Sequence, residues 1–331
     1  IDAEEVGHLI ALAYPERIAH ATDHAGNFKM SNGNTIFIDP CDSMAANEWL
    51  AIASLNLASI SSSNSGQGRK GRVFLSAPVN WKNLPAQTCE NISWNSKTLE
   101  VKMQQETRIG ALIIDSKPIQ NANRETVSNI ICEAARKDGL SMFDWNESVH
   151  RLQQRVAQVA EWHPELEIPD LSTEHLLSTA QAWLPFYLEE GGKMKTSVTE
   201  LKKLNLCEIL WNILPYDLQQ EIDRLAPTHI RVPSGSNIRI DYRLGAEAPV
   251  LSVRLQECFG MTSTPTVDAG RQPLLLELLS PGFKPVQLTR DLASFWQGTY
   301  FEVRKELKRR YPKHFWPENP LESQAVRGVK R

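Results

Sequence analysis

The stretch Asn27–Asp39, NFKMSNGNTIFID, has two apolar-rich segments on either side of an Asn-Gly pair. Asn and Gly tolerate the positive φ angles of a two-residue turn, so this pair between strand-like runs is a strong local signal for a β-hairpin. The sequence therefore predicts a hairpin at this point, and the neighbouring segments extend the β-pattern in both directions.

Further strand-like runs follow this hairpin as far as Ile119, and they read EWLAIASL (48–55), RVFLSAPV (72–79) and LEVKMQQETRIGALIIDSKPI (99–119). Short strands in close succession are typical of a small barrel, so residues 23–119 are predicted to form an OB-like β-barrel. A polar stretch, SSSNSGQGRKGR (61–72), separates two of the runs. It lacks the G-x-x-x-x-G-K-[ST] spacing of a phosphate loop, and we interpret it as a flexible cationic loop.

The segments before and after the predicted barrel have a helical pattern. Residues 1–22 carry apolar residues at helical spacing, with a break or kink expected at Pro15. Residues 120–227 form the predicted helical segment, in which Gly139 is expected to end a first helix and Ser172 to cap a later one.

Strand-like runs return in residues 228–320, which are predicted to form an α+β domain. The run LSVRLQECFG (251–260) is ambiguous between helix and strand. Thr289 is expected to cap one long final helix that continues to about Tyr311, and residues 321–331 are expected to be a disordered tail. The complete chain is therefore predicted to be an α+β protein, with an OB-like barrel, an all-helical centre and a C-terminal α+β domain.

The predicted final helix has two different faces. One face is an apolar stripe at 3–4 spacing, formed by Leu292, Phe295, Trp296, Thr299, Val303 and Leu307. The other face carries Arg304, Lys305 and Lys308, with Phe301 among them. Cations around an aromatic ring suit phosphates and a stacked base, although a solvated helix face remains the alternative because Glu302 and Glu306 dilute the charge.

The helix is followed by Pro312 and by Phe315, Trp316 and Pro317, which we expect to fold back as a hydrophobic latch.

Charge is distributed unevenly along the chain. Residues 124–224 hold 10 Lys and Arg against 17 Asp and Glu, whereas residues 228–331 hold 16 against 10. An acidic centre and a basic end indicate separate surfaces with separate partners.

The sequence contains no motif that would mark it as an enzyme. It lacks G-x-G-x-x-G, H-E-x-x-H and G-x-S-x-G, and its five cysteines form no C-x-x-C pair, so no catalytic residue and no metal site is predicted. No run of about 18 apolar residues is present, and no membrane span is expected.

One long segment of the C-terminal domain resembles a known family. GRQPLLLELLSPGFKPVQLTRDLASFWQGTYFEVRKELKRRYPKHFWPENP (270–320) looks like the C-terminal signature of HrpB-type ATP-dependent RNA helicases of the bacterial DEAH-box group. IALAYPERIA, FKMSNG, EWLAIASL, RIGALII, VPSGSNIRIDY and VRLQECFG also match in kind and order. The chain departs from the family pattern at Arg309, where a Gly is usual, and at Gln104 and Gln105 in a region that is often richer in Arg.

The resemblance implies that this chain lacks the motor domains. Residues 1–22 would then be the end of an upstream helical domain, and ATP and Mg would bind outside this chain, which would have no cofactor of its own. It further implies a cytoplasmic, monomeric accessory region whose partners are single-stranded RNA and the motor of the same polypeptide. A structural or protein-docking module without direct RNA contact is the alternative. The candidate nucleic-acid-binding residues are Arg69, Lys70, Arg72, Lys102, Arg108, Arg290, Phe301, Arg304, Lys305, Lys308, Arg309, Arg310 and Lys313.

Overall fold

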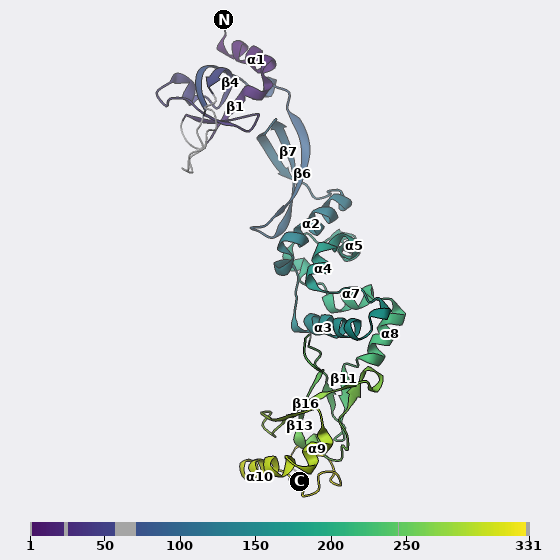
Figure 1. Ribbon diagram of the computed structural model, residues 1–331. Coiled ribbons are helices and arrows are strands. Elements are labelled where there is room, and N and C mark those ends of the chain that lie inside the picture. The colour runs from purple at the N-terminus through teal and green to yellow at the C-terminus, as the bar shows by residue number, and fades with distance from the viewer. Residues whose placement is uncertain (1, 23–25, 57–70, 244, 329–331) are drawn as a thin grey trace. The chain divides into compact units, whose positions relative to one another are not determined.

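The computed structural model describes residues 2–22, 26–56, 71–243 and 245–328, and it is drawn in Figure 1. Contacts between residues divide the chain into two units, Ile1–Ile131 and Cys132–Arg331. The division falls inside helix α2 (Arg124–Met142), whereas the sequence placed a boundary between residues 119 and 120. The fold is a mixed α+β fold, as predicted.

The first unit contains a closed barrel of five strands in the order β1-β2-β3-β5-β4. The strands are β1 (Ile18–Ala21), β2 (Asn27–Met30), β3 (Thr35–Phe37), β4 (Trp49–Asn56) and β5 (Gly71–Pro78). The hairpin predicted at Asn27–Asp39 is confirmed, because β2 and β3 pair antiparallel and Gly33 adopts a positive φ in the turn. Phe28, Met30 and Ile36 are fully buried in the barrel interior, which explains the alternating apolar pattern of this stretch.

Helix α1 (Ala3–Ala13) packs on one side of the barrel, next to β4 and β5. Asp2 caps it by accepting a hydrogen bond from the backbone N–H of Glu4 (3.1 Å). A Cβ at Gly7 would lie 1.9 Å from the carbonyl oxygen of Pro78, so only glycine permits this close approach of helix and strand. The helix ends before Pro15, and Ile18 already belongs to the barrel.

The run 99–119 does not belong to the barrel, and this part of the prediction is wrong. It forms, with residues 87–95, a separate antiparallel sheet of β6 (Gln87–Asn95), β7 (Glu100–Ile109) and β8 (Leu112–Pro118). β1 pairs directly with β4 and thereby closes the barrel without these strands. Ile109 and Leu112, at the β7–β8 turn, join an apolar cluster with Trp49 of the barrel and Ala11 of α1.

The second unit begins with helices, as the pattern of residues 120–227 predicted. They are α3 (Glu147–Trp162), α4 (Thr173–Ser178), α5 (Ala180–Trp183), α6 (Val198–Leu201), α7 (Leu206–Ile213) and α8 (Tyr216–Leu225), with a small hairpin of β9 (Glu189–Glu190) and β10 (Lys193–Met194) among them. Ser172 caps α4, as expected. Gly139 does not end α2: the helix continues to Met142, and a Cβ at Gly139 would meet the Leu177 side chain at 2.3 Å.

Three small sheets follow in the C-terminal part of this unit. β11 (His229–Arg231) pairs with β12 (Asn237–Arg239), and β14 (Thr266–Val267) pairs with β15 (Gln272–Pro273). The main sheet has the order β13-β16-β17, formed by β13 (Val250–Arg254), β16 (Leu275–Leu279) and β17 (Pro285–Thr289). The ambiguous run 251–260 starts as strand β13 and then turns into a short 3-10 helix, Leu255–Cys258.

The prediction of one long terminal helix is wrong. The segment forms two helices, α9 (Leu292–Gln297) and α10 (Tyr300–Arg310), which are separated at Gly298, where φ is −123° and ψ is −87°. The cap is Asp291 instead of Thr289, which ends strand β17. Because of the break, Tyr300 continues the buried side of the helix pair, and Thr299 is exposed.

Residues 321–328, predicted as a disordered tail, return toward the main sheet. The backbone N–H of Val326 donates to the carbonyl of Gln256 (3.0 Å).

Among the helices in the described part of the chain, none combines the length and the apolar character that crossing a membrane requires.

Candidate nucleic-acid interface

Helix α10 is held in place by a cluster of aromatic side chains. Tyr300 is fully buried, and its ring lies edge-on to Phe259 (6.3 Å between centroids) and to Trp296 (5.2 Å). Trp296 is 3% exposed and donates its indole N–H to the carbonyl of Met261 (2.8 Å). One side of α10 is therefore fixed against the domain core, and the other side faces away from it.

The segment after α10 folds back, as the latch hypothesis predicted. Trp316 is 5% exposed, and its indole N–H donates to the carbonyl of Tyr311 (3.0 Å). The Tyr300 hydroxyl donates to the carbonyl of Pro317 (2.8 Å), and the backbone N–H of Gly260 donates to the carbonyl of Pro320 (2.9 Å). Trp316 is thus a packing residue, so its ring is not available to stack on a base.

Arg304 takes part in the same latch, although the sequence placed it on the cationic face. Its Nε donates to the carbonyl of Trp316 (3.1 Å), and its Nη2 lies 3.4 Å from a carboxylate oxygen of Glu318. Only 20% of its side chain is exposed. In the helix, position 304 is one turn from Tyr300 and Leu307, which both face the core. Arg304 is therefore a positioning residue for the latch.

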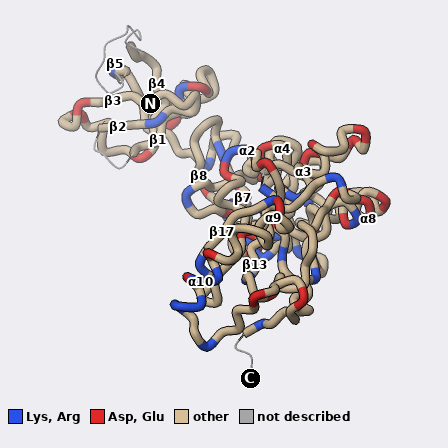
Figure 2. The backbone as a smooth tube through the Cα atoms, turned by 60° about the horizontal axis from the view of Figure 1, so that its bottom comes forward, with Lys and Arg blue, Asp and Glu red and all other residues tan. Residues whose placement is uncertain are grey.

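The remaining cations of α10 gather on its outer side. Phe301, Lys305, Lys308 and Arg309 are spaced i, i+4, i+7 and i+8, so they share one face of the helix, and all four are exposed. Figure 2 shows the basic residues along α10. Within the described ranges, no carboxylate oxygen lies within 4.0 Å of the charged nitrogens of these three cations. Glu302 and Glu306 are also exposed on α10.

Three further candidates of this domain lie near the ends of its elements. Arg310 and Lys313 are exposed at the C-terminal end of α10 and just beyond it. Arg290 follows strand β17, and its Nη1 lies 3.7 Å from a carboxylate oxygen of Glu247, so its charge already has a partner.

The candidates in the first unit are arranged differently. Arg108, on β7, donates its Nε to Glu106 (2.6 Å), and the two also form an ion pair through Nη2. Glu106 is 2% exposed and also accepts from Asn91 Nδ2 (2.9 Å). This bond and the adjacent Arg108 guanidinium hold the pKa of Glu106 below its usual range, against the effect of burial. Arg108 therefore neutralises a buried carboxylate.

Lys102 is exposed on the same strand as Arg108, and its charge also lowers the pKa of Glu106. Arg72, on β5, places its guanidinium 5.9 Å from the ring centroid of Phe74. Arg69 and Lys70 lie outside the described residues. The structure thus brings together the exposed candidates of α10, whereas the described candidates of the first unit are divided between β5, which carries Arg72, and β7, which carries Lys102 and Arg108.

Sequence reasoning missed a buried charged cluster in the second unit. His163, at the end of α3, has Nε2 2.6 Å from a carboxylate oxygen of Asp268 and Nδ1 2.7 Å from one of Glu165. These two hydrogen bonds raise the pKa of His163 above its ordinary value, against the effect of burial. Asp268 has a φ of +54°, a conformation that L-residues rarely adopt. No local signal indicates this pairing, because the two residues are 105 positions apart.

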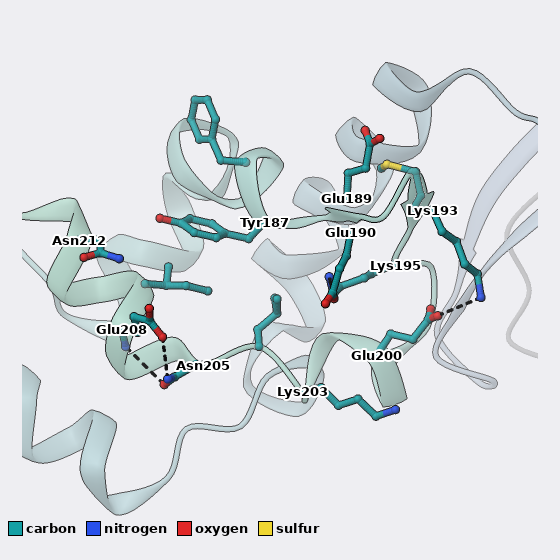
Figure 3. A pocket seen from close by; sticks show the side chains of 14 residues that line it. Tyr187, Glu189, Glu190, Lys193, Lys195, Glu200, Lys203, Asn205, Glu208 and Asn212 are labelled. Carbon is teal, nitrogen blue, oxygen red and sulfur yellow. Dashed lines mark hydrogen bonds and ion pairs between the residues drawn. The ribbon is translucent and has the colours of Figure 1, made fainter.

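A cavity of about 520 Å³ lies between the β9–β10 hairpin and α7, and Figure 3 shows its side chains. Its basic residues are balanced by acidic ones: Lys195 pairs with Glu190 (2.7 Å) and Lys193 with Glu200 (3.5 Å). No group of three or more His, Cys, Asp or Glu side chains suitable for a metal ion occurs in the described residues.

The C-terminal part of this fold is similar to a known family. Residues 183–320 match the family described as ATP-dependent helicase C-terminal, which spans the end of the helical segment, the main sheet and the latch.

The similarity extends to a particular relative. The chain is 34% identical over 337 aligned residues to the ATP-dependent RNA helicase HrpB of Escherichia coli, and the match covers 100% of this chain and 40% of that protein. A crystal structure titled as the E. coli DExH-box NTPase HrpB matches with a TM-score of 0.60 and 32% identity, over 98% of this chain and 40% of that one. A second, titled as the Escherichia coli DEAH/RHA helicase HrpB, matches with a TM-score of 0.53 and 31% identity, over 94% and 38%.

The resemblance predicted from the sequence is therefore confirmed: the chain is similar, over its whole length, to the C-terminal region of HrpB-type ATP-dependent RNA helicases. It spans 40% of the length of the curated relative that it matches.

Proposed function

We propose that this chain is a non-catalytic accessory region of an ATP-dependent RNA helicase, and that the outer face of α10 contributes to RNA binding. The observation that carries this proposal is the set of exposed cations Lys305, Lys308 and Arg309, which have no carboxylate partner among the described residues and lie around the half-exposed ring of Phe301. Cations without carboxylate partners are available to phosphate oxygens, and a ring between them offers a surface on which a base can stack. The similarity to HrpB supports RNA as the ligand.

The two faces of α10 have separate roles in this proposal. The buried face and Arg304 hold the helix and the latch together, and the outer face makes the contacts with RNA. The contacts of the cations would be made to the phosphates of the RNA backbone, so they would add affinity without distinguishing one RNA sequence from another.

The test is the double substitution Lys305→Ala, Lys308→Ala, with binding of poly(U) RNA measured across a series of salt concentrations. Each lost phosphate contact should reduce the slope of log affinity against log salt by about 0.7 for a single strand. The fold should change little, because substitutions of exposed, unpaired side chains usually alter stability by less than about 0.5 kcal/mol. An unchanged salt slope with an unchanged melting temperature would refute the RNA-facing role of α10.

In this proposal ATP and Mg bind to motor domains outside this chain. The purified chain should then hydrolyse no ATP, because its sequence holds no phosphate loop. We propose that the motor domains are its partners in the same polypeptide, and that it acts as a monomer in the cytoplasm.

The protein-docking alternative is favoured by one observation. Phe186 is 80% exposed and lines the cavity of about 520 Å³ together with Met194 and Ile209. An exposed aromatic ring at the edge of a partly apolar cavity is typical of a site that holds a partner's side chain. If the double lysine variant retains its salt slope, this cavity becomes the better candidate for the function of the chain.

A further inference from the structure

The hairpin β11–β12 carries a second group of basic side chains, which the sequence analysis did not single out. His229 lies directly opposite Arg239 in the pairing register, and Arg231 lies opposite Asn237. All four are exposed, whereas Ile230 and Ile238, on the other face, are partly buried. Two basic groups directly opposite each other do not stabilise a hairpin, so packing gives no reason for this arrangement.

The charges of this hairpin lack the partners that neighbouring arginines have. The nearby guanidinium groups each pair with a carboxylate, in the pairs Arg151–Glu147, Arg155–Asp223 and Arg243–Asp241. In contrast, no carboxylate oxygen of the described chain lies within 4.0 Å of the side-chain nitrogens of Arg231 or Arg239. Glu257, which approaches the hairpin tip at Ser234 (2.7 Å), already pairs with Arg254 (2.7 Å).

A cavity of about 260 Å³ opens beside this face, between α3, α7 and the hairpin. Arg151, Arg155, His229 and Arg239 line it, and Asp241 is the single carboxylate in its lining. Leu152, Ile240 and Tyr242 supply apolar surface from the same elements. This volume lies below the range of about 300–1,000 Å³ that is common for drug-sized ligands, so it suits one small ring system.

We propose that this cavity and the adjacent hairpin face bind one nucleotide of single-stranded RNA. The phosphate would lie near Arg239 and His229, and the base would pack against the apolar wall formed by Leu152 and Ile240. A nucleotide uses both parts of the site, whereas an acidic peptide side chain would use the cations and leave the apolar wall without a partner. The inference rests on the proposed RNA-binding function and adds a second contact, away from α10.

The balance of charge distinguishes this cavity from the larger one at the β9–β10 hairpin. There, Glu190 and Glu200 pair with the two lysines of the hairpin, so an added phosphate would have to displace a carboxylate. Beside β11–β12, no carboxylate of the described chain pairs with Arg239, and Asp241, the carboxylate in the lining, pairs with Arg243. An anion therefore gains more at the smaller site.

The first test uses Arg239→Gln, with poly(U) binding measured across a series of salt concentrations. The loss of one phosphate contact should reduce the slope of log affinity against log salt by about 0.7. For each tenfold dilution of salt, the affinity of the variant should therefore rise about fivefold less than that of the parent protein. Arg239→Lys, which keeps the charge, should restore most of the slope. The control is Lys202→Gln, which removes the same charge from an exposed position that lines neither cavity. It should leave the slope unchanged.

The second test needs no substitution. Cys207 lines the cavity, where its Sγ lies 3.5 Å from the carbonyl of Ser148, whereas Cys41 is exposed in the first unit. Saturating poly(U) should slow the alkylation of Cys207 by iodoacetamide several-fold, as followed by mass spectrometry, and leave that of Cys41 unchanged. The same measurement with polyglutamate tests the acidic-peptide alternative.

A reduced slope for Arg239→Gln alone, together with protection of Cys207 by poly(U), would support the nucleotide site. An effect of Arg239→Gln no larger than that of Lys202→Gln, or protection of Cys207 by polyglutamate and not by poly(U), would overturn it. If Arg239→Gln has no effect while the double Lys305→Ala, Lys308→Ala variant loses slope, this site fails and the proposed function stands. If poly(U) binds with no salt dependence to any of these proteins, both fail.

Discussion

The outer face of α10 and the polar face of β7 carry similar basic residues, yet their charges are used differently. On β7, Arg108 forms an ion pair with the buried carboxylate of Glu106, so its charge is largely neutralised within the fold. On α10, Lys305, Lys308 and Arg309 have no carboxylate partner in the described structure. Buried aromatic rings hold the helix from its other side, so the fold does not need these charges to fix the helix. The difference shows that a basic residue becomes a candidate for binding only when the fold does not already need its charge.

The largest expected effect is on the aromatic side of α10. Trp316→Ala should destabilise the protein by about 3–5 kcal/mol, because it removes a large ring that is 5% exposed and leaves a cavity. Denaturant unfolding measures this loss, and Phe301→Ala, on the exposed face of the same helix, is the matched control. A loss below about 1 kcal/mol for Trp316→Ala would contradict the view that the latch holds α10.

The pairing on β7 can be broken by Glu106→Gln, which keeps the shape of the side chain and removes its charge. Arg108 would then be free to contact phosphate, so the salt slope of poly(U) binding should increase by about 0.7. The melting temperature should fall, because the ion pair is lost from a nearly buried site. If the melting temperature falls and the slope stays constant, Arg108 lies away from bound RNA.

A third arrangement of charge, at His163, should be visible in the pH dependence of stability. The pKa of His163 is raised in the folded protein, so its stabilising effect is fully present below its ordinary pKa of about 6.5. That effect is lost as the pH rises through the higher folded pKa. Bonding to His163 lowers the pKa of Glu165, so the effect of Glu165 is instead present above about pH 4.3 and is lost in acid.

The measurement is the unfolding free energy from about pH 4 to pH 9, and His163→Gln should flatten the alkaline fall. His175→Gln, which replaces an exposed histidine of α4, is the control and should leave the pH profile unchanged. A wild-type profile that rises above pH 7 would contradict a raised pKa for His163.

The smallest effect is expected for Arg290→Gln. Arg290 is already near Glu247 and lies off the outer face of α10, so the salt slope should change by much less than 0.7 and the stability by less than about 0.5 kcal/mol. A full loss of one phosphate contact in this variant would extend the binding surface from α10 to the end of β17.

Features that depend on neighbouring residues could be predicted from the sequence. The hairpin at Asn27–Asp39 and the cap at Ser172 follow from local turn and capping chemistry, and both were found. The buried positions of Trp296 and Trp316 follow from the helical spacing and from the proline after α10.

Features that depend on distant residues could not. Gly139 continues its helix because it packs on Leu177, and the barrel closes through the pairing of β1 with β4, which leaves β7 in another sheet. In the candidate interface, the helical pattern placed Lys305 and Lys308 correctly on an exposed face. It could not show that Arg304 would turn toward Trp316, because that contact depends on how the chain returns after Pro312.

The return of the chain after α10 also matters for the order in which the protein is made. Phe259, Gly260 and Tyr300 are synthesised before Phe315, Pro317 and Pro320, which complete their contacts. The ring of Phe315 packs on Phe259, and the carbonyls of Pro317 and Pro320 accept hydrogen bonds from Tyr300 and Gly260. A ribosome that has not yet passed Pro320 therefore carries a domain whose aromatic core is still incomplete and accessible. Truncated products that stop shortly before Phe315 would expose the same rings, and exposed apolar surface of this kind makes incompletely folded chains prone to aggregation.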